Sequence, residues 1–181
     1  MRPHRLTRPP RSRTIPDYDG SPASASFRAR ESSPAVTPAD WLLFLLALED
    51  AVQPLDPVRL QKGMFLFAEQ AHLPPSQRYQ FKPYDYGPLS PAIYSDLETL
   101  HADGLLIADR PPGQHWPEYR ISQRGLQRAR ELLDAMAPEE LAAIRTLADI
   151  KSAVLSRDFR DLLLYVYERH PEYARNSVFR F

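Results

Sequence analysis

One stretch, residues 59–104, constrains the fold more than any other part of the chain. It reads RLQKGMFLFAEQAHLPPSQRYQFKPYDYGPLSPAIYSDLETLHADG, with proline and glycine where the helical patterns stop. We predict a helix, an extended link rich in aromatic residues, a turn at Tyr86-Gly87-Pro88, and a second helix that ends at Gly104. Two helices joined in this way form the skeleton of a helix-turn-helix unit.

The first helix of this unit follows a capping signal. Asp56 can accept hydrogen bonds from first-turn N–H groups, and Pro57 suits the first helical position. Apolar residues then recur with helical spacing at Leu60, Met64, Phe65, Phe67, Ala68 and Ala71. Because Lys62 and Glu69 lie off this stripe, we expect both side chains in solvent.

The link between the two helices begins like a strand. Residues 79–84 alternate aromatic with polar side chains, but Pro83 has no N–H to donate, which predicts an edge strand or an extended connection. Gly87 can adopt a positive φ and Pro88 restricts the chain that follows. Ser90 then caps the second helix, with proline at its first position.

A β-hairpin is predicted directly after this unit. Residues 105–108 and 118–121 are short β-type segments on either side of a loop that contains proline and glycine. A hairpin in this position makes a helix-turn-helix unit winged. The expected fold is therefore mostly α with a small β-hairpin wing, a winged helix-turn-helix core decorated by additional C-terminal helices.

Further helices flank this core in the sequence. Thr37 and Asp40 form a capping-box pattern around Pro38, and we expect the helix that they start to run until Pro54. Three more helices are predicted to start near Ser122, Pro138 and Asp158. The closing residues 172–181 are aromatic and basic, and we expect them to fold back onto the body.

Residues 1–36 differ in composition from the rest of the chain. They hold six prolines and seven arginines against three acidic residues, a net charge of +4, so the remainder of this neutral chain carries −4. Such a segment buries little apolar surface, which predicts a disordered arm, or upstream sequence translated from a misassigned start codon. The functional alternative is an arginine arm that binds nucleic acid or an acidic partner. The folded domain is expected over residues 37–181.

Composition also excludes several classes of protein. The chain has no cysteine, which rules out disulfides and thiolate metal sites. Its longest apolar run, residues 41–48, is far shorter than the roughly 20 residues of a membrane span. The arginine-rich N-terminus is not followed by the apolar segment of a secretory signal. We therefore expect a cytoplasmic protein that does not bind membranes.

No motif in the sequence predicts bond chemistry. The histidines at 72, 101 and 115 lack the spacing of metal ligands. A phosphate-binding glycine loop and a nucleophile motif are also missing from the sequence. The prediction is a protein that is not an enzyme and that has no metal and no cofactor.

The order of three motifs resembles a known family. RLQKGMFLF, YQFKPYDYGPLSPAIYSDLETLHADGLL and YRISQRG, in this order, resemble the Panacea antitoxin proteins (SocA-like) and the related YwgA-like winged-helix proteins. The closing LLLYVYERHPEYARNS also resembles the end of YwgA-type sequences. The resemblance covers about residues 40–180 and leaves the arginine arm out. It implies a winged-helix domain and, in the Panacea-like branch, an antitoxin that neutralises a cognate toxin by protein contact. It implies no catalytic residues.

The second helix of the unit is acidic where a winged helix reads DNA. Residues 89–103 contain Asp96, Glu98 and Asp103 and neither lysine nor arginine. Phosphate contacts depend on cations, and guanine is read most often by arginine or lysine. Binding of nucleic acid through this helix is therefore disfavoured.

The tyrosines around the turn are the strongest candidates for partner binding. Tyrosine joins a large apolar area to a hydrogen-bonding tip and is enriched at interfaces. We expect Phe81 and Tyr86 to face the core and Tyr84 and Tyr79 to face a partner. The predicted partner-binding set is Tyr79, Tyr84, Tyr86, Tyr94, Asp96 and Glu98, around the structural turn at Gly87 and Pro88.

Arg120, Arg124 and Arg128 are spaced by four residues and would share one helix face if the helix starts early enough. They would form either a solvated face paired with Glu131 or a contact site for nucleic acid or an acidic partner.

The leading hypothesis is a protein that acts through protein contacts, as an antitoxin or adaptor. The alternative is a transcriptional regulator that binds nucleic acid through the basic arm and these arginines.

Overall fold

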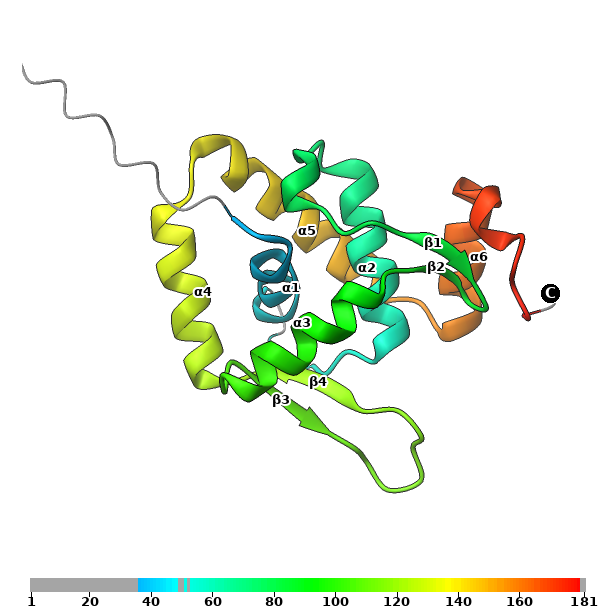
Figure 1. The fold of residues 1–181 in the computed structure, drawn as a ribbon, viewed down its shortest axis with the longest axis horizontal. Coiled ribbons are helices and arrows are strands. Elements are labelled where there is room, and N and C mark those ends of the chain that lie inside the picture. Colours follow the sequence, from blue (N-terminus) through cyan, green and yellow to red (C-terminus); the bar gives the residue numbers. More distant parts are fainter. Residues whose placement is uncertain (1–35, 49–50, 52, 180–181) are drawn as a thin grey trace, which may run out of the picture. The chain divides into compact units, whose positions relative to one another are not determined.

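Six α-helices hold most of the chain that the computed structural model describes, which is residues 36–48, 51 and 53–179 (Figure 1). The helices are α1 (Pro38–Ala47), α2 (Pro57–Gln70), α3 (Pro91–Ala102), α4 (Gln123–Ala135), α5 (Pro138–Leu155) and α6 (Phe159–Arg169). Two antiparallel hairpins accompany them, β1 (Lys82–Tyr84) with β2 (Gly87–Leu89) and β3 (Leu106–Asp109) with β4 (Glu118–Ile121). The expectation of a mostly helical chain with a small hairpin is confirmed by β3–β4, and the β1–β2 hairpin is an addition to it.

The predicted arm lies outside the described residues, with one exception. Val36 is described, and only 4% of it is exposed. Thr37 caps α1 through the predicted capping box with Asp40. The described part of the chain therefore includes one buried residue that the composition assigned to the arm.

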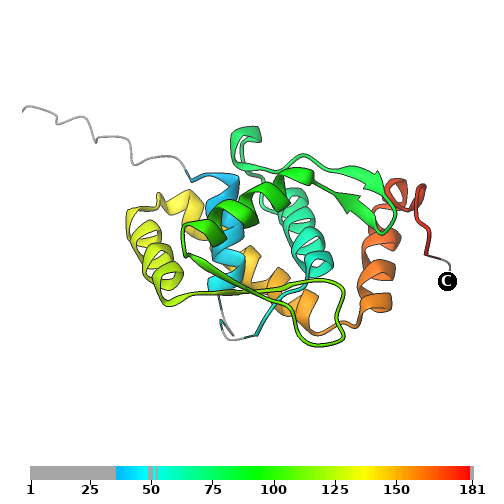
Figure 2. The ribbon, with the colours of Figure 1, turned by 60° about the horizontal axis from the view of Figure 1, so that its bottom comes forward.

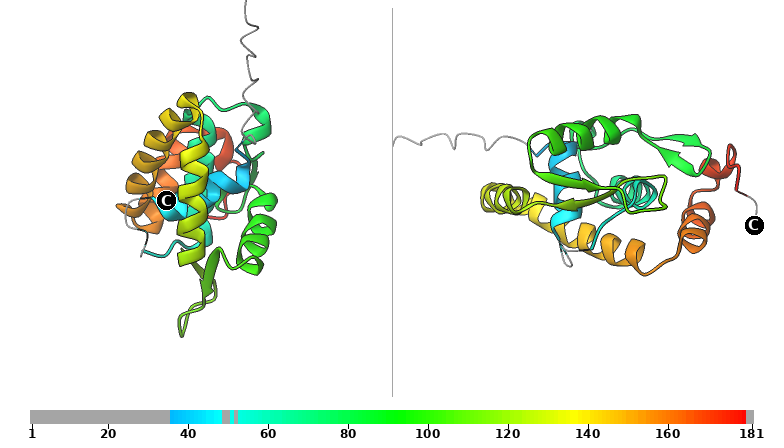
Figure 3. Two further views of the ribbon diagram at one scale, coloured as in Figure 1. Left: turned by 90° about the vertical axis from the view of Figure 1, so that its left-hand side faces the viewer. Right: turned by 90° about the horizontal axis from the view of Figure 1, so that it is seen from below.

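Helix α2 lies at the centre of the fold, between α5 on one side and the β1–β2 hairpin on the other (Figure 3). Ten of its fourteen residues are buried. Glu69 is exposed as expected, but the prediction for Lys62 was wrong, because only 3% of this lysine is exposed. A helix that is covered on several sides buries residues outside its apolar stripe, and the lysine ammonium is then satisfied by hydrogen bonding.

Helix α1 is shorter than predicted. It ends at Ala47, whereas the apolar pattern and Pro54 placed its end several residues later. The buried Lys151 of α5 donates hydrogen bonds to the carbonyl oxygens of Leu46 and Leu48. These carbonyls lie at the end of the helix, where no following turn supplies N–H groups to donate hydrogen bonds to them. A tertiary contact thus satisfies the C-terminus of α1.

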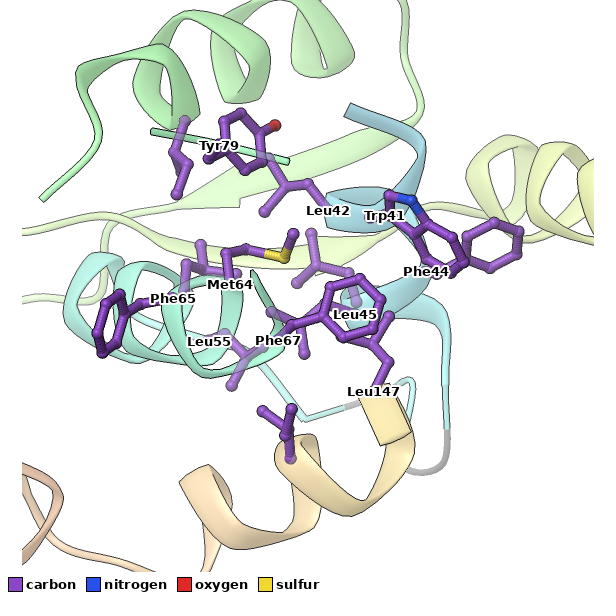
Figure 4. Close-up of a cluster of buried hydrophobic side chains, with 14 of the residues drawn as sticks. Trp41, Leu42, Phe44, Leu45, Leu55, Met64, Phe65, Phe67, Tyr79 and Leu147 are labelled. Carbon is purple, nitrogen blue, oxygen red and sulfur yellow. The ribbon is translucent and has the colours of Figure 1, made fainter. Parts of the chain in front are cut away.

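The core forms where α1, α2 and α5 meet, and Figure 4 shows the aromatic rings of Trp41, Phe44 and Phe67 within it. The centroid of the Trp41 ring lies 5.0 Å from that of Phe67 and 5.8 Å from that of Phe44. Both are separations of favourable aromatic pairs. Burial of each large apolar side chain contributes about 1.5–3 kcal/mol, so these three rings together make a substantial contribution to the stability of the fold.

The aromatic link folds into the β1–β2 hairpin. Its strands pair Lys82 with Leu89 and Tyr84 with Gly87, which makes Asp85 and Tyr86 the two-residue loop. Gly87 has the predicted positive φ, at +90°. A Cβ atom at Gly87 would also lie 2.8 Å from Cε1 of Tyr167, so the position excludes a side chain for two reasons.

The β3–β4 hairpin forms at the predicted positions, and Figure 2 shows it on the opposite side of α3 from the first hairpin. Leu55, between α1 and α2, extends this sheet by an antiparallel bridge to Tyr119. Ser122 caps α4 as predicted by accepting from the N–H of Gly125.

The C-terminal segment folds back onto the body as predicted, as far as residue 179. The N–H of Val178 donates to the carbonyl of Asp85, and the side-chain amide of Asn176 donates to that of Pro83. The hydroxyl of Tyr167 donates to Oγ of the buried Ser177. These bonds hold the segment beside β1. None of the described helices has the length and apolar character needed to cross a bilayer.

Candidate partner-binding surface

Three tyrosines with large exposed areas lie near the start of α3. Tyr84 is 49% exposed at the end of β1, Tyr86 is 42% exposed in the hairpin loop, and Tyr94 is 39% exposed in the first turn of α3. Exposed aromatic residues of this size are typical of contact surfaces, because each offers apolar area together with a hydroxyl group.

Tyr84 and Tyr94 influence each other electrostatically, and Tyr94 also influences Tyr119 on the second hairpin. Burial raises the pKa of Tyr94, its hydrogen bond with Gln61 opposes this rise, and the nearby Tyr84 adds to it. Burial also raises the pKa of Tyr119 on β4, where Tyr94 and Glu98 reinforce the effect and Arg110 opposes it. Each group is thus close enough to influence the next. We call Tyr84, Tyr94 and Tyr119 the tyrosine row.

Tyr86 belongs to a separate group of aromatic rings. Its ring centroid lies 5.7 Å from that of Phe159 on α6, which in turn lies 5.7 Å from that of Phe179. The prediction that Tyr86 faces the core was wrong, because a residue in a two-residue hairpin loop projects beyond the strands. The prediction for Phe81 is confirmed, since its ring packs edge-on against Phe65 with centroids 5.3 Å apart.

Tyr79 does not belong to the exposed surface. Only 6% of it is exposed, and its hydroxyl donates a 2.6 Å hydrogen bond to Oδ2 of Asp96 on α3. Burial raises the pKa of Tyr79, and the bond with Asp96 adds to the rise. The predicted partner contact at Tyr79 is therefore wrong. Asp96 is occupied in the same internal pair, whereas Glu98 is exposed.

Two polar residues of α2 hold the junction between the first hairpin and α3. The side-chain amide of Gln61 donates to the carbonyl of Ser90 at 3.0 Å and accepts from the N–H of Ser90 at 2.9 Å. Lys62 donates to the carbonyl of Pro88 at 3.0 Å. Burial lowers the pKa of Lys62 to about 7, and the nearby Asp56 only partly opposes this.

Sequence reasoning missed this role of Gln61 and Lys62. The available signal was a pair of adjacent polar residues inside a helix that is apolar before and after them. These bonds fix the backbone of Pro88 and Ser90, which connects the strand that ends the hairpin to α3. The position of Tyr84 relative to Tyr94 depends on this connection.

The predicted arginine stripe does not form. Arg120 lies on β4, because α4 starts only at Gln123, and its guanidinium donates two hydrogen bonds to Oδ2 of Asp109, at 2.6 and 3.0 Å. Arg128 lies on α4, 3.8 Å from Glu131. Arg120 and Arg128 are therefore exposed and each is paired with a carboxylate, as in the first of the two predicted alternatives. Arg124 is exposed on α4, whereas Arg120 lies on the preceding strand and does not share its helix face.

The histidines and carboxylates offer no metal centre within the part of the chain that is described. His101 places Nδ1 3.1 Å from the carbonyl oxygen of Leu106, at the junction of α3 and β3. Comparison of the sequence with known protein families and with curated proteins finds no significant match.

Proposed function

We propose that this chain is a non-enzymatic winged-helix protein that acts by binding another protein, as an antitoxin that neutralises a cognate toxin or as an adaptor. The observation that carries the proposal is the exposure of Tyr84, Tyr86 and Tyr94 around the start of α3. Together with the resemblance to Panacea-like antitoxins at the LQK and YGP motifs, these residues favour recognition of a protein partner.

The order of elements supports a winged-helix core. Helix α1 is followed by the bridging residue Leu55, helices α2 and α3, and the β3–β4 hairpin in the place of a wing. The link between α2 and α3 differs from the short turn of a standard helix-turn-helix, because it contains the β1–β2 hairpin. This hairpin carries two of the three exposed tyrosines, so the departure from the standard pattern coincides with the candidate surface.

The distribution of charge supports protein binding over DNA binding. Helix α3 and its cap carry Asp96, Glu98 and Asp103 without lysine or arginine. Such a helix repels phosphate. Arg120, which the alternative needs for contact with nucleic acid, already holds Asp109. The alternative, a transcriptional regulator, therefore depends mainly on the N-terminal arm.

The groups with strongly shifted pKa values support a non-enzymatic role. Such groups often mark active sites. Here Lys62 is enclosed and donates to a backbone carbonyl, and Tyr79 is buried against Asp96. Both groups are used in packing α2, the link and α3 together, which accounts for their shifts without catalysis.

A tagged pulldown from the native host tests the proposal, with eluates analysed for protein and for nucleic acid at low and high salt. Three forms are compared: the full chain, a chain that starts at Ser32 and so keeps Val36, and a Tyr84→Ser/Tyr94→Ser variant. We expect one stoichiometric protein partner that survives high salt in the first two forms and is lost in the third. Recovery of nucleic acid alone, released by salt or by removal of the arm, would favour the regulator instead.

A further inference from the structure

We infer that the tyrosine row binds an arginine-bearing segment of the partner, whose guanidinium groups stack on Tyr84 and Tyr94 and pair with Glu98. The inference rests on the proposed function and adds the chemistry of the partner. Three observations support it: the tyrosine rings are exposed, the carboxylate of Glu98 is exposed on the same helix as Tyr94, and arginine side chains already stack on a tyrosine elsewhere in this chain.

The rings of the row are available for stacking. Tyr84 ends β1, Tyr94 lies in α3 and Tyr119 lies on β4, so the three tyrosines come from the first hairpin, from α3 and from the second hairpin. Figures 1 and 2 show how these elements are arranged. Among the described residues, neither Tyr84 nor Tyr94 has another aromatic ring or a guanidinium stacked on it. Both rings are therefore exposed, and no stacking partner from the described residues covers them.

A carboxylate stands beside the middle of the row. Glu98 follows Tyr94 by one helical turn and is exposed, and it lies near enough to Tyr119 to disfavour ionisation of that phenol. The cations in the neighbourhood, Lys82 on β1 and Arg110 near Tyr119, lie toward the two ends of the row. A cation stacked on Tyr94 would thus have the carboxylate of Glu98 one helical turn away.

Tyr165 on α6 shows how this chain already pairs tyrosine with arginine. The guanidinium carbon of Arg157 lies 4.0 Å from the centroid of the Tyr165 ring, and that of Arg169 lies 3.8 Å from it. A planar guanidinium can stack on a ring and still donate hydrogen bonds at its edge, which an ammonium group does less well. Arginine is therefore the residue that uses both the rings and the carboxylate of the row.

The test is a titration of the full chain with a labelled peptide of about twelve residues in which arginine alternates with glycine and serine, followed by fluorescence anisotropy. Two peptides of the same length replace arginine by lysine or by uncharged citrulline. We expect the arginine peptide to bind best, because it supplies both the charge and the planar group. Tyr84→Ser and Glu98→Gln should each weaken it about threefold, and the double variant about tenfold.

Two control variants distinguish binding at this site from nonspecific electrostatic attraction of the peptide to the protein. Asp103→Asn removes the same charge from the end of α3, and Tyr86→Leu removes an exposed tyrosine outside the row. Neither should change the affinity. The inference fails if the controls weaken binding as much as the row variants, if the peptide does not bind at about 1 mM, or if a polyanion binds to the same residues.

The inference and the proposed function fail separately. Suppose that a host partner is captured and needs Tyr84 and Tyr94, but that Glu98→Gln does not weaken its binding and the arginine peptide does not displace it. The proposed function would then stand, and the inference would be overturned. If no protein partner is captured and the peptide still binds at the row, the inference stands while the antitoxin or adaptor role does not.

Discussion

The ammonium group of Lys62 donates a hydrogen bond to the carbonyl oxygen of Pro88, 3.0 Å away, and both residues are buried. The contact joins the central helix to the strand that leads into α3. It couples the LQK and YGP motifs, which are 26 residues apart in the chain. A lysine in this position stabilises one path of the backbone at the cost of burying its own charge.

The burial of Lys62 predicts a dependence of stability on pH. Its pKa falls from 10.5 in the unfolded chain to about 7 in the folded one, so between these values the unfolded chain binds a proton that the folded chain does not. The free energy of unfolding should therefore rise with pH from about 7 toward 9.5, by about 1 kcal/mol per pH unit. Urea denaturation at several pH values measures this.

Lys62→Met is the matched variant for this slope. Methionine keeps much of the apolar stem but does not titrate, so the rise should be absent, and the loss of the bond to Pro88 adds a separate cost that does not vary with pH. Ionisation of the buried Tyr79 acts in the opposite direction only above about pH 10, because its pKa is raised above 10.0. Equal slopes for the two proteins below pH 9.5 would contradict the assignment.

Gln61→Leu should destabilise the protein by about 1–3 kcal/mol. The substitution leaves the N–H of Ser90 buried without its partner, whereas the carbonyl of Ser90 loses one donor but still accepts from the N–H of Ile93. Gln127→Leu is the control, since Gln127 is exposed on α4 and bonds only to Glu131, and it should change stability by less than about 0.5 kcal/mol. Chemical denaturation of both variants decides whether the Ser90 contact matters.

Asp96 and Glu98 should differ sharply although they are two residues apart on α3. Asp96→Ala removes the acceptor of the Tyr79 hydroxyl, which is buried, and should cost about 2 kcal/mol. Glu98→Ala should leave stability within about 0.5 kcal/mol, because its side chain is exposed. If Tyr79→Phe suppresses the effect of Asp96→Ala in a double-mutant cycle, the hydrogen bond is its cause; additive losses would argue against it.

Gly125→Ala should cost about 2 kcal/mol or more. A Cβ atom there would lie 2.1 Å from the carbonyl oxygen of Leu105, and this carbonyl cannot move away cheaply because it accepts from the N–H of Ser122. Gly113→Ala is the comparison, since its φ of +83° strains a side chain but nothing lies within 4 Å. A thermal melt that ranks Gly113→Ala as the more harmful change would contradict the close approach of α4 to Leu105.

Local signals in the sequence predicted most of the element boundaries. Caps at Thr37, Asp56, Ser122 and Asp158 start helices where expected, because a capping hydrogen bond involves only residues within one turn. The end of α1 was misplaced for the opposite reason. It is satisfied by Lys151, more than a hundred residues away in the chain, and no local pattern indicates such a partner.

The candidate surface was predicted in part. Tyr84 and Tyr94 are exposed as expected, and Glu98 is exposed one helical turn after Tyr94. Tyr79, which was expected to face a partner, is buried, and Tyr86, which was expected to face the core, is exposed. Aromatic residues have the same composition signal whether they face the core or a partner. Which of them is buried depends on how α3 and α6 cover the link, and the alternation along the link does not contain this information.

The sequence by itself determined the order of the helices, the positive φ at Gly87, the β3–β4 hairpin and the acidic character of α3, since each depends on neighbouring residues alone. Only the tertiary structure decided that Lys62 is buried, that Tyr79 pairs with Asp96, and that Arg120 holds Asp109 rather than joining a helical stripe. These outcomes depend on which surfaces meet when the chain folds. Polar groups enclosed by such contacts take the partners that the packing provides, because a buried polar group without a hydrogen bond is costly.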